Sequence, residues 1–184
     1  GETGNGKITC VISSKEDAYA LERAKNNGIK TIVLKRKDYP DVASYSKAMA
    51  ETLKAENADL VVYAGFMTIL DEQVCNAFPY KMINVHPALI PSFCGKGFYG
   101  LHVHEAALAK GVKLSGATVH FVTEECDGGP IILQKAVEVK NGDTPETLQK
   151  RIMEEAEWKI LPYAVKLFCD DKIEIRNGLA VVSE

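Results

Sequence analysis

Short apolar runs along the chain alternate with longer segments in which apolar residues recur every three or four positions. The run 7–13 (KITCVIS) is rich in β-branched residues and predicts a strand, and Leu21 and Ala24 then follow at helical spacing. We expect that helix to end at Asn27-Gly28, because glycine readily adopts the left-handed conformation that closes a helix. A second short strand is predicted over 31–34. The chain therefore begins as strand, helix, strand.

The same alternation continues through the middle of the chain. The run 60–64 (LVVYA) is apolar throughout, which is typical of a strand covered on both faces in a parallel sheet. The expected elements here are a helix over 41–57, a strand over 60–64, a short helix over 71–77, a strand over 81–85 and a long irregular segment over 87–100.

The last third changes character. After a helix over 103–110, strands over 116–123 and 131–139 are separated by a glycine-rich turn and predict an antiparallel pair. Thr144 should cap a long helix that reaches about residue 170 and is kinked or divided at Pro162, and a hairpin over 173–182 should end the chain. These patterns predict the α/β class: one Rossmann-like domain over 1–184, with a mainly parallel open sheet, helices on both faces and an antiparallel extension.

Composition narrows the classes of function. The 184 residues carry 22 Lys and Arg against 25 Asp and Glu, a formal charge of −3, which disfavours binding to a nucleic-acid backbone. No apolar run approaches the roughly 20 residues of a membrane span, and no signal peptide is visible. The five cysteines are scattered and form no C-x-x-C pair, so we expect a reducing, cytoplasmic location.

Candidate chemistry lies where predicted strands end, because open parallel sheets bind ligands at the carboxyl ends of their strands. Asn84 and His86 are two residues apart on one strand, so their side chains should lie on the same face. Together they could stabilise negative charge on a carbonyl oxygen. The alternative is that Asn84 caps the loop and His86 is a structural strand-end histidine.

Two further strand ends could contribute. Asp127 precedes Gly128-Gly129, where a carboxylate could orient a histidine or pass a proton through water, although Asp-Gly is also a common turn. The segment 65–70 (GFMTIL) could line a flat, aromatic-sized pocket, or it could be part of the core.

The sequence disfavours a metal site and a cysteine nucleophile. His102 and His104 are two apart, a spacing that points them away from each other on a helix, and no C-x-x-C or H-E-x-x-H pattern supports a metal site. Cys94 and Cys126 lie near the candidate loops, but neither has an obvious base nearby in sequence, so a cysteine nucleophile is only a weak alternative.

The ordered combination of motifs resembles a known family. It is similar to the phosphoribosylglycinamide formyltransferases from residue 7 onward. The motifs that carry the resemblance are N-x-H-P-x-L-x-P at 84–91, H-x-H at 102–104 and D-G-G-P-I at 127–131. The resemblance implies transfer of a formyl group from 10-formyltetrahydrofolate to the amine of glycinamide ribonucleotide in purine biosynthesis, without a metal.

The resemblance also implies roles for individual residues. Asn84, His86 and Asp127 would be catalytic, with Asn84 and His86 holding the oxyanion and Asp127 positioning His86. Glu157 would contact the glycinamide end of the nucleotide, with Glu154 or Glu155 as alternatives, and Pro87 would also contact substrate. The folate would be bound by Phe66, Met67, Thr68, Ile69, Leu70, Asn84, Thr123, Glu124 and Asp127.

The chain departs from the family pattern at two places. The family begins with a strand and a glycine-rich phosphate loop that this sequence lacks, so a first strand and the phosphate loop are expected to be missing. The segment 92–99 is longer than in many members, and Lys96 within it could attract phosphate or simply be solvated.

Related enzymes share the Asn, His and Asp residues. A methionyl-tRNA formyltransferase would need a basic nucleic-acid module, which the charge of −3 disfavours. A formyltetrahydrofolate hydrolase and a noncatalytic folate-binding module both remain alternatives. The expected partners are small molecules, with no nucleic acid and no membrane, in a monomer or homodimer.

Overall fold

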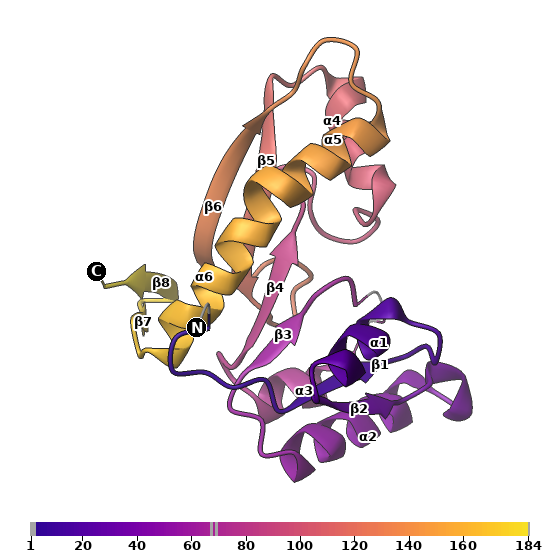
Figure 1. The fold of residues 1–184 in the computed structure, drawn as a ribbon. Helices are drawn as coiled ribbons and strands as arrows, with labels where there is room; N and C mark the ends of the chain where they lie inside the picture. The colour runs from indigo at the N-terminus through magenta and orange to yellow at the C-terminus, as the bar shows by residue number, and fades with distance from the viewer. Residues whose placement is uncertain (1–2, 67, 69, 184) are drawn as a thin grey trace. The chain divides into compact units, whose positions relative to one another are not determined.

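A computed structural model describes residues 3–66, 68 and 70–183 (Figure 1). The chain divides into two compact units. The amino-terminal unit comprises residues 7–61 and 65–81, and the carboxy-terminal unit comprises the described parts of 1–6, 62–64 and 82–184. The expectation of a single domain over 1–184 stays a prediction.

The amino-terminal unit is built on a parallel strand pair. Strand β1 (Cys10–Ser13) pairs with β2 (Lys30–Val33), and helix α1 (Tyr19–Asn26) connects them. Gly28 has a φ of +67° just after this helix, which is the left-handed residue that the sequence predicted. A 3₁₀ turn, η1 (Arg36–Asp38), follows β2.

Helices α2 (Val42–Ala55) and α3 (Glu72–Ala77) complete this unit. Asp41 caps α2 by accepting a hydrogen bond from the amide of Ser44, and Asp71 caps α3 in the same way from Gln73. Apolar residues at helical spacing form the buried face of α2, and they are Tyr45, Met49, Ala50 and Leu53. The unit is therefore stabilised by the amphipathic pattern visible in the sequence.

A four-stranded sheet has the order β3-β4-β5-β6. Its strands are β3 (Val61–Tyr63), β4 (Met82–His86), β5 (Leu114–Phe121) and β6 (Ile131–Glu138). The β4–β5 and β5–β6 pairs are antiparallel, and β5 is buried along nearly its whole length. The expected antiparallel extension is confirmed, and so is the α/β class.

Helix α4 (Leu101–Lys110) ends at Gly111 in the left-handed conformation. A longer helical run then lies along β5 and β6 (Figure 1). It consists of α5 (Pro145–Ile152), the π-helical turn η2 (Met153–Glu157) and α6 (Trp158–Cys169). Strands β7 (Ile173–Arg176) and β8 (Leu179–Val182) form the predicted terminal hairpin.

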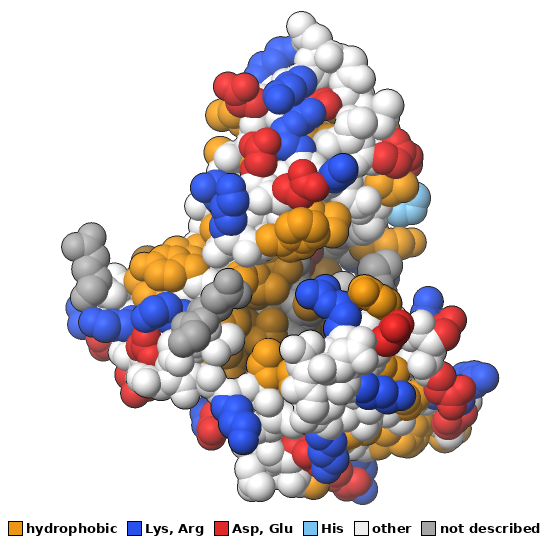
Figure 2. All heavy atoms as spheres, viewed as in Figure 1, with side chains coloured by type: hydrophobic (Ala, Val, Ile, Leu, Met, Phe, Trp, Pro, Cys, Tyr) orange, Lys and Arg blue, Asp and Glu red, His pale blue; other side chains and the backbone are white. Residues whose placement is uncertain are grey.

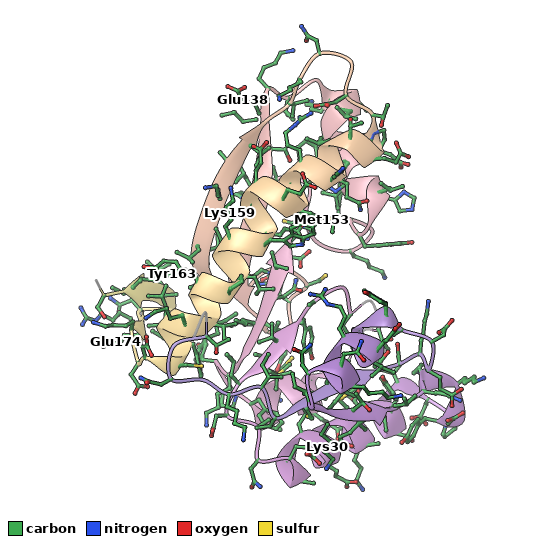
Figure 3. The ribbon with its side chains drawn as sticks, in the orientation of Figure 1. Lys30, Glu138, Met153, Lys159, Tyr163 and Glu174 are labelled. Atoms are coloured by element: carbon green, nitrogen blue, oxygen red, sulfur yellow. The ribbon has the colours of Figure 1, made fainter. Side chains whose placement is uncertain are left out.

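The irregularity in this helical run lies at the π turn, where Met153 is marked in Figure 3, and not at Pro162, which lies inside α6. The reason is the spacing of the buried residues Leu148, Ile152, Ala156, Ile160 and Ala164. A strict spacing of four drifts about 160° around an ideal α-helix between the first and last of these positions. A π turn accommodates an extra residue and so keeps the apolar stripe on the sheet.

The surface carries mixed charge. Basic and acidic side chains are interspersed over the face shown in Figure 2, as the near-balanced composition suggests. Within the described ranges, no helix is long and apolar enough to cross a membrane.

Candidate active site

Strand pairing brings the sequence-predicted residues together in the carboxy-terminal unit. Asn84 and His86 are two residues apart on β4. The register partner of Asn84 on β5 is His120, and that of His86 is Thr118. Both histidines are buried: 4% of His86 and 2% of His120 is exposed. Antiparallel pairing therefore adds a second imidazole to the predicted asparagine and histidine.

Asp127 lies between the two imidazoles. Its Oδ2 is 3.6 Å from Nδ1 of His86, and its Oδ1 is 3.6 Å from Nε2 of His120. The amide of Gly95 donates a 2.9 Å hydrogen bond to Oδ2. Burial alone would raise the pKa of Asp127, but the His120 and Gly95 donors and the two imidazoles outweigh it and lower that pKa to about 2. The side chain is therefore a carboxylate at neutral pH.

His86 has distinct partners at its two ring nitrogens. Nε2 lies 2.8 Å from the carbonyl oxygen of Phe93, which can only accept, so Nε2 carries a proton. Nδ1 faces the carboxylate of Asp127. Burial lowers the pKa of His86, while the Phe93 carbonyl and Asp127 oppose that shift. An oxygen atom can thus be held at Nε2 while Asp127 orients the ring.

Asn84 is oriented by His120, a contact that the sequence reasoning missed. Nδ1 of His120 donates to the carbonyl of Phe121 at 2.8 Å, and Nε2 of the same ring lies 3.3 Å from Nδ2 of Asn84. The amide of Asn84 has two N–H donors, so one remains for another oxygen. The sequence shows His120 within a predicted strand, but no local pattern indicates which other strand that strand pairs with.

His104 also approaches this cluster. It is fully buried on α4, and neither ring nitrogen has a hydrogen-bond partner among the described residues. Burial, with a smaller contribution from His86, lowers the pKa of His104 to about 4. The ring is therefore neutral at physiological pH.

The cysteines and the remaining histidine are differently placed. Sγ of Cys126 lies 3.8 Å from Oδ2 of Asp127, and burial together with that carboxylate raises the pKa of both Cys94 and Cys126. Both are therefore thiols at neutral pH, which disfavours a cysteine nucleophile. His102 is exposed and pairs with Glu105 at 3.0 Å. The described residues contain no group of three or more side chains suited to a metal ion.

The predicted folate residues are divided between the two units. Phe66, Thr68 and Leu70 are half-buried in the amino-terminal unit, whereas Met67 and Ile69 lie outside the described residues. In the carboxy-terminal unit Thr123 is half-buried, and its hydroxyl donates to the carbonyl of Glu125 at 3.3 Å. Glu124 is exposed. Their roles stay predictions.

Three acidic residues were candidates for the substrate contact, and their environments differ. Glu154 and Glu155 are exposed, but Glu157 is half-buried at the end of the π turn. Burial raises the pKa of Glu157 to about 7, and no hydrogen-bond or ion-pair partner for it exists within the described chain. Pro87 is half-buried next to His86, and Lys96 is exposed.

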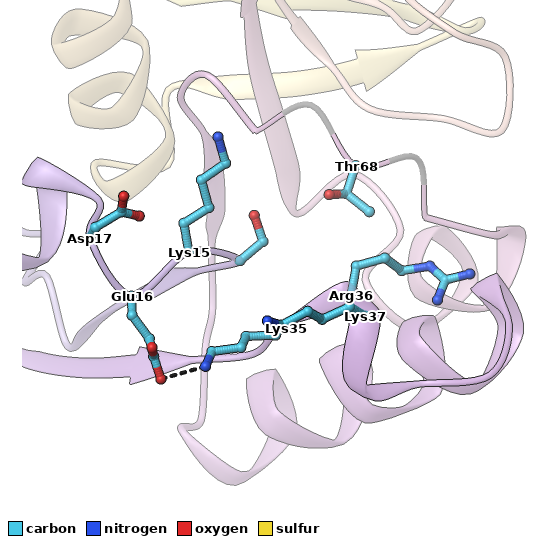
Figure 4. Close-up of a pocket in the computed structure, with 8 residues that line it drawn as sticks. Lys15, Glu16, Asp17, Lys35, Arg36, Lys37 and Thr68 are labelled. Carbon is cyan, nitrogen blue, oxygen red and sulfur yellow. Dashed lines mark ion pairs between the residues drawn. The ribbon is translucent and has the colours of Figure 1, made fainter.

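The amino-terminal unit has a cavity of its own, with a volume of about 500 Å³, at the carboxyl ends of β1 and β2 (Figure 4). Four of the residues that line it are basic: Lys15, Lys35, Arg36 and Lys37. Lys35 is paired with Glu16, while Nη1 of Arg36 donates to the carbonyl of Tyr39 at 2.8 Å. Thr68 also lines this cavity. Glu16 and Asp17 line it as well, so the lining keeps only a small excess of positive charge.

Comparison with known proteins defines the class. A family model described as formyl transferase matches residues 1–165. This chain belongs to the formyl transferase family.

Particular relatives narrow the comparison. The chain is 39% identical over 174 residues to the chloroplastic phosphoribosylglycinamide formyltransferase of Arabidopsis thaliana, covering 94% of this chain and 59% of that protein. It is 35% identical to the phosphoribosylglycinamide formyltransferase of Escherichia coli, covering 95% of this chain and 80% of that protein. The resemblance inferred from the motifs is therefore confirmed.

Solved structures of similar proteins lead to the same family. Glycinamide ribonucleotide transformylase 1 from Symbiobacterium toebii has a TM-score of 0.91 at 41% identity, covering 97% of this chain and 82% of that one. A formyltetrahydrofolate deformylase from Pseudomonas syringae has a TM-score of 0.83 at 30% identity, covering 97% of this chain and 57% of that one.

Proposed function

We propose that this protein transfers a formyl group from 10-formyltetrahydrofolate to the amine of glycinamide ribonucleotide, a step of purine biosynthesis. The observation that carries the proposal is the continuous cluster of Asn84, His120, Asp127 and His86, supported by the names of the most similar relatives. The formyl-folate acts as a cosubstrate, and the chemistry uses no metal.

The chemistry is an attack of the substrate amine on the formyl carbon. The carbonyl oxygen becomes an oxyanion, the bond from carbon to N10 of the folate then breaks, the amine loses a proton and N10 gains one. The free N–H of Asn84 and Nε2–H of His86 are suited to donate to the oxyanion, a contribution of about 3 kcal/mol for one such donor. Asp127 remains ionised, holds the ring of His86 and can relay the proton through water.

One contact must change during this reaction. The carbonyl oxygen of Phe93 lies 2.8 Å from Nε2 of His86, at the distance at which a formyl oxygen would be bound. The formyl oxygen would therefore replace the Phe93 carbonyl when the donor binds.

Glu157 is our choice for the contact with the glycinamide end of the nucleotide, with Pro87 close to the same substrate. Unlike Glu154 and Glu155, Glu157 is half-buried and lacks a partner within the described residues, so a substrate N–H group would satisfy it. We assign the pterin to the segment from Phe66 to Leu70 together with residues 123–127, as the family resemblance implies.

The test is a spectrophotometric assay of formyl loss from 10-formyltetrahydrofolate, with and without glycinamide ribonucleotide, on the wild type and on His86→Ala. Turnover that requires the nucleotide and disappears in the variant would support the proposal. Turnover that ignores the nucleotide would instead indicate the activity named for the Pseudomonas syringae relative.

The absence of turnover would leave the alternative of a folate-binding module. Isothermal titration separates these cases, since a module would bind the folate but not the nucleotide. We also propose a reducing compartment such as the cytoplasm, because the five cysteines are scattered along the sequence and form no C-x-x-C pair.

A further inference from the structure

A row of three side chains crosses the sheet next to the candidate site. His86 on β4 is the register partner of Thr118 on β5, and Thr118 is the register partner of Gln134 on β6. Residues directly opposite each other in adjacent strands place their side chains on the same face of the sheet. Thr118 and Gln134 therefore extend from His86 toward the sheet edge, although neither touches the His86 ring in any hydrogen bond.

The hydroxyl of Thr118 is fully used by hydrogen bonds to the loop that follows His86 and to Gln134 on β6. It donates to the carbonyl of Ala88 at 2.7 Å, accepts from the amide of Ile90 at 3.1 Å and accepts from Nε2 of Gln134 at 2.9 Å. A hydroxyl has one donor and two acceptor positions, so all three are occupied. Thr118 is completely buried, which makes each of these bonds costly to lose.

Gln134 completes the attachment. The second N–H of its side-chain amide donates to the carbonyl of Ile90 at 2.9 Å. Ile90 is thus held at both its amide and its carbonyl, by Thr118 and Gln134 respectively. Two neighbouring strands of the sheet therefore hold the first residues of an otherwise irregular segment.

The segment so held carries two groups of the candidate site. Soon after Ile90, the carbonyl of Phe93 accepts from His86 and the amide of Gly95 donates to Asp127. The intervening turn is short and is itself hydrogen-bonded, from the amide of Ser92 to the carbonyl of Leu89 at 2.9 Å. Displacement of residues 88–90 would therefore displace the partners of both His86 and Asp127.

We infer that Thr118 and Gln134 are positioning residues for His86 and Asp127, acting through the segment 88–95. Their catalytic meaning rests on the proposed function, but their effect on the environment of His86 does not. The titratable groups that face His86 are Asp127, His120 on β5 and His104 on α4.

Thr118→Val tests this inference because it keeps the shape of the side chain and removes the hydroxyl. We expect kcat to fall about tenfold, since small misplacements at a site have effects of this size or larger, while KM for both substrates stays within about twofold. Thr118→Ser restores the hydroxyl and should recover kcat to within about threefold of wild type. Urea unfolding of all variants measures the stability cost separately.

Gln134→Met is the second variant, because Gln134 is an exposed residue of the edge strand β6 and methionine keeps the length of the side chain but removes its amide. Its matched control is Lys135→Met, the same kind of change at the next residue of β6, an exposed position. We expect Gln134→Met to lower kcat in the same direction as Thr118→Val, and Lys135→Met to leave it unchanged.

The pKa of the His86 ring, measured by NMR, distinguishes a positioning role from a merely structural one, because a loss of stability alone would not change it. Loosening of the segment 88–95 admits water but also weakens the contact with the Phe93 carbonyl, a contact that raises the His86 pKa. Because burial is the larger cause, we expect that pKa to rise toward its ordinary value in Thr118→Val and to return in Thr118→Ser. An unchanged titration in both Thr118→Val and Gln134→Met would overturn the inference, even if stability or kcat fell. Because this titration needs no turnover, it decides the inference even if the transferase assay fails.

Discussion

Nδ1 of His86 lies 3.6 Å from Oδ2 of Asp127, which joins the end of a central strand to a distant glycine-rich turn. Asp127 has a φ of +57° there, so the turn conformation aims its carboxylate at the imidazole. The same carboxylate approaches His120 through its other oxygen. One carboxylate therefore lies close to two imidazole rings, and one of these rings, His120, also contacts Asn84.

Asp127→Asn should lower kcat by about a hundredfold or more, because the carboxylate that holds the His86 ring is replaced by a neutral amide. Steady-state kinetics of formyl transfer measure the effect. Glu138→Gln, an exposed acidic residue of β6, is the control and should behave as wild type. An Asp127→Asn enzyme with nearly full activity would contradict the assigned role.

His120→Ala should reduce kcat by about tenfold, less than Asn84→Ala, since it removes the ring that contacts the amide of Asn84 but leaves the amide itself. The comparison requires both variants in the same assay. His102 is exposed, so His102→Ala should leave kcat nearly unchanged. If His120→Ala were as active as His102→Ala, the contact with Asn84 would have no catalytic importance.

His104 should make the protein less stable in mild acid. Its pKa is about 4 in the folded state against 6.5 for an unperturbed histidine, so the unfolded chain binds a proton first as the pH falls. The folded state therefore loses up to about 3 kcal/mol of stability between pH 6.5 and 4 and none from this source above that range.

Urea unfolding across that pH range, on the wild type and on His104→Leu, checks this. The variant should show a flatter dependence on pH, whatever its absolute stability. His102→Leu is the matched comparison, and it should keep the wild-type slope because His102 is exposed. Equal slopes in all three proteins would rule out the buried neutral imidazole as the cause.

Glu157 should make nucleotide binding depend on pH near neutrality. Burial raises its pKa to about 7, so the carboxylate that can accept a substrate N–H group forms as the pH rises through that value. KM for glycinamide ribonucleotide should accordingly fall between about pH 6 and 8. In Glu157→Gln, KM should be high and independent of pH, whereas the same behaviour in Glu155→Gln would assign the contact to the other residue.

The amino-acid sequence by itself determined the local elements and the family. The alternation of apolar runs and helical spacings predicted nearly every strand and helix, because each element needs one apolar face or run to bury. Asn84, His86 and Asp127 were recognisable because they lie near the ends of predicted strands or in the turn after one, within an unusual combination of motifs.

The tertiary structure alone decided which strands pair, and with them the second half of the site. Nothing local in the residues of β4 and β5 specifies that they are antiparallel neighbours, since strand pairing depends on burial across the whole sheet. That pairing sets His120 opposite Asn84 and Thr118 opposite His86. The π turn is likewise a tertiary outcome, because an apolar spacing of four must stay on the sheet, and it leaves Glu157 half-buried.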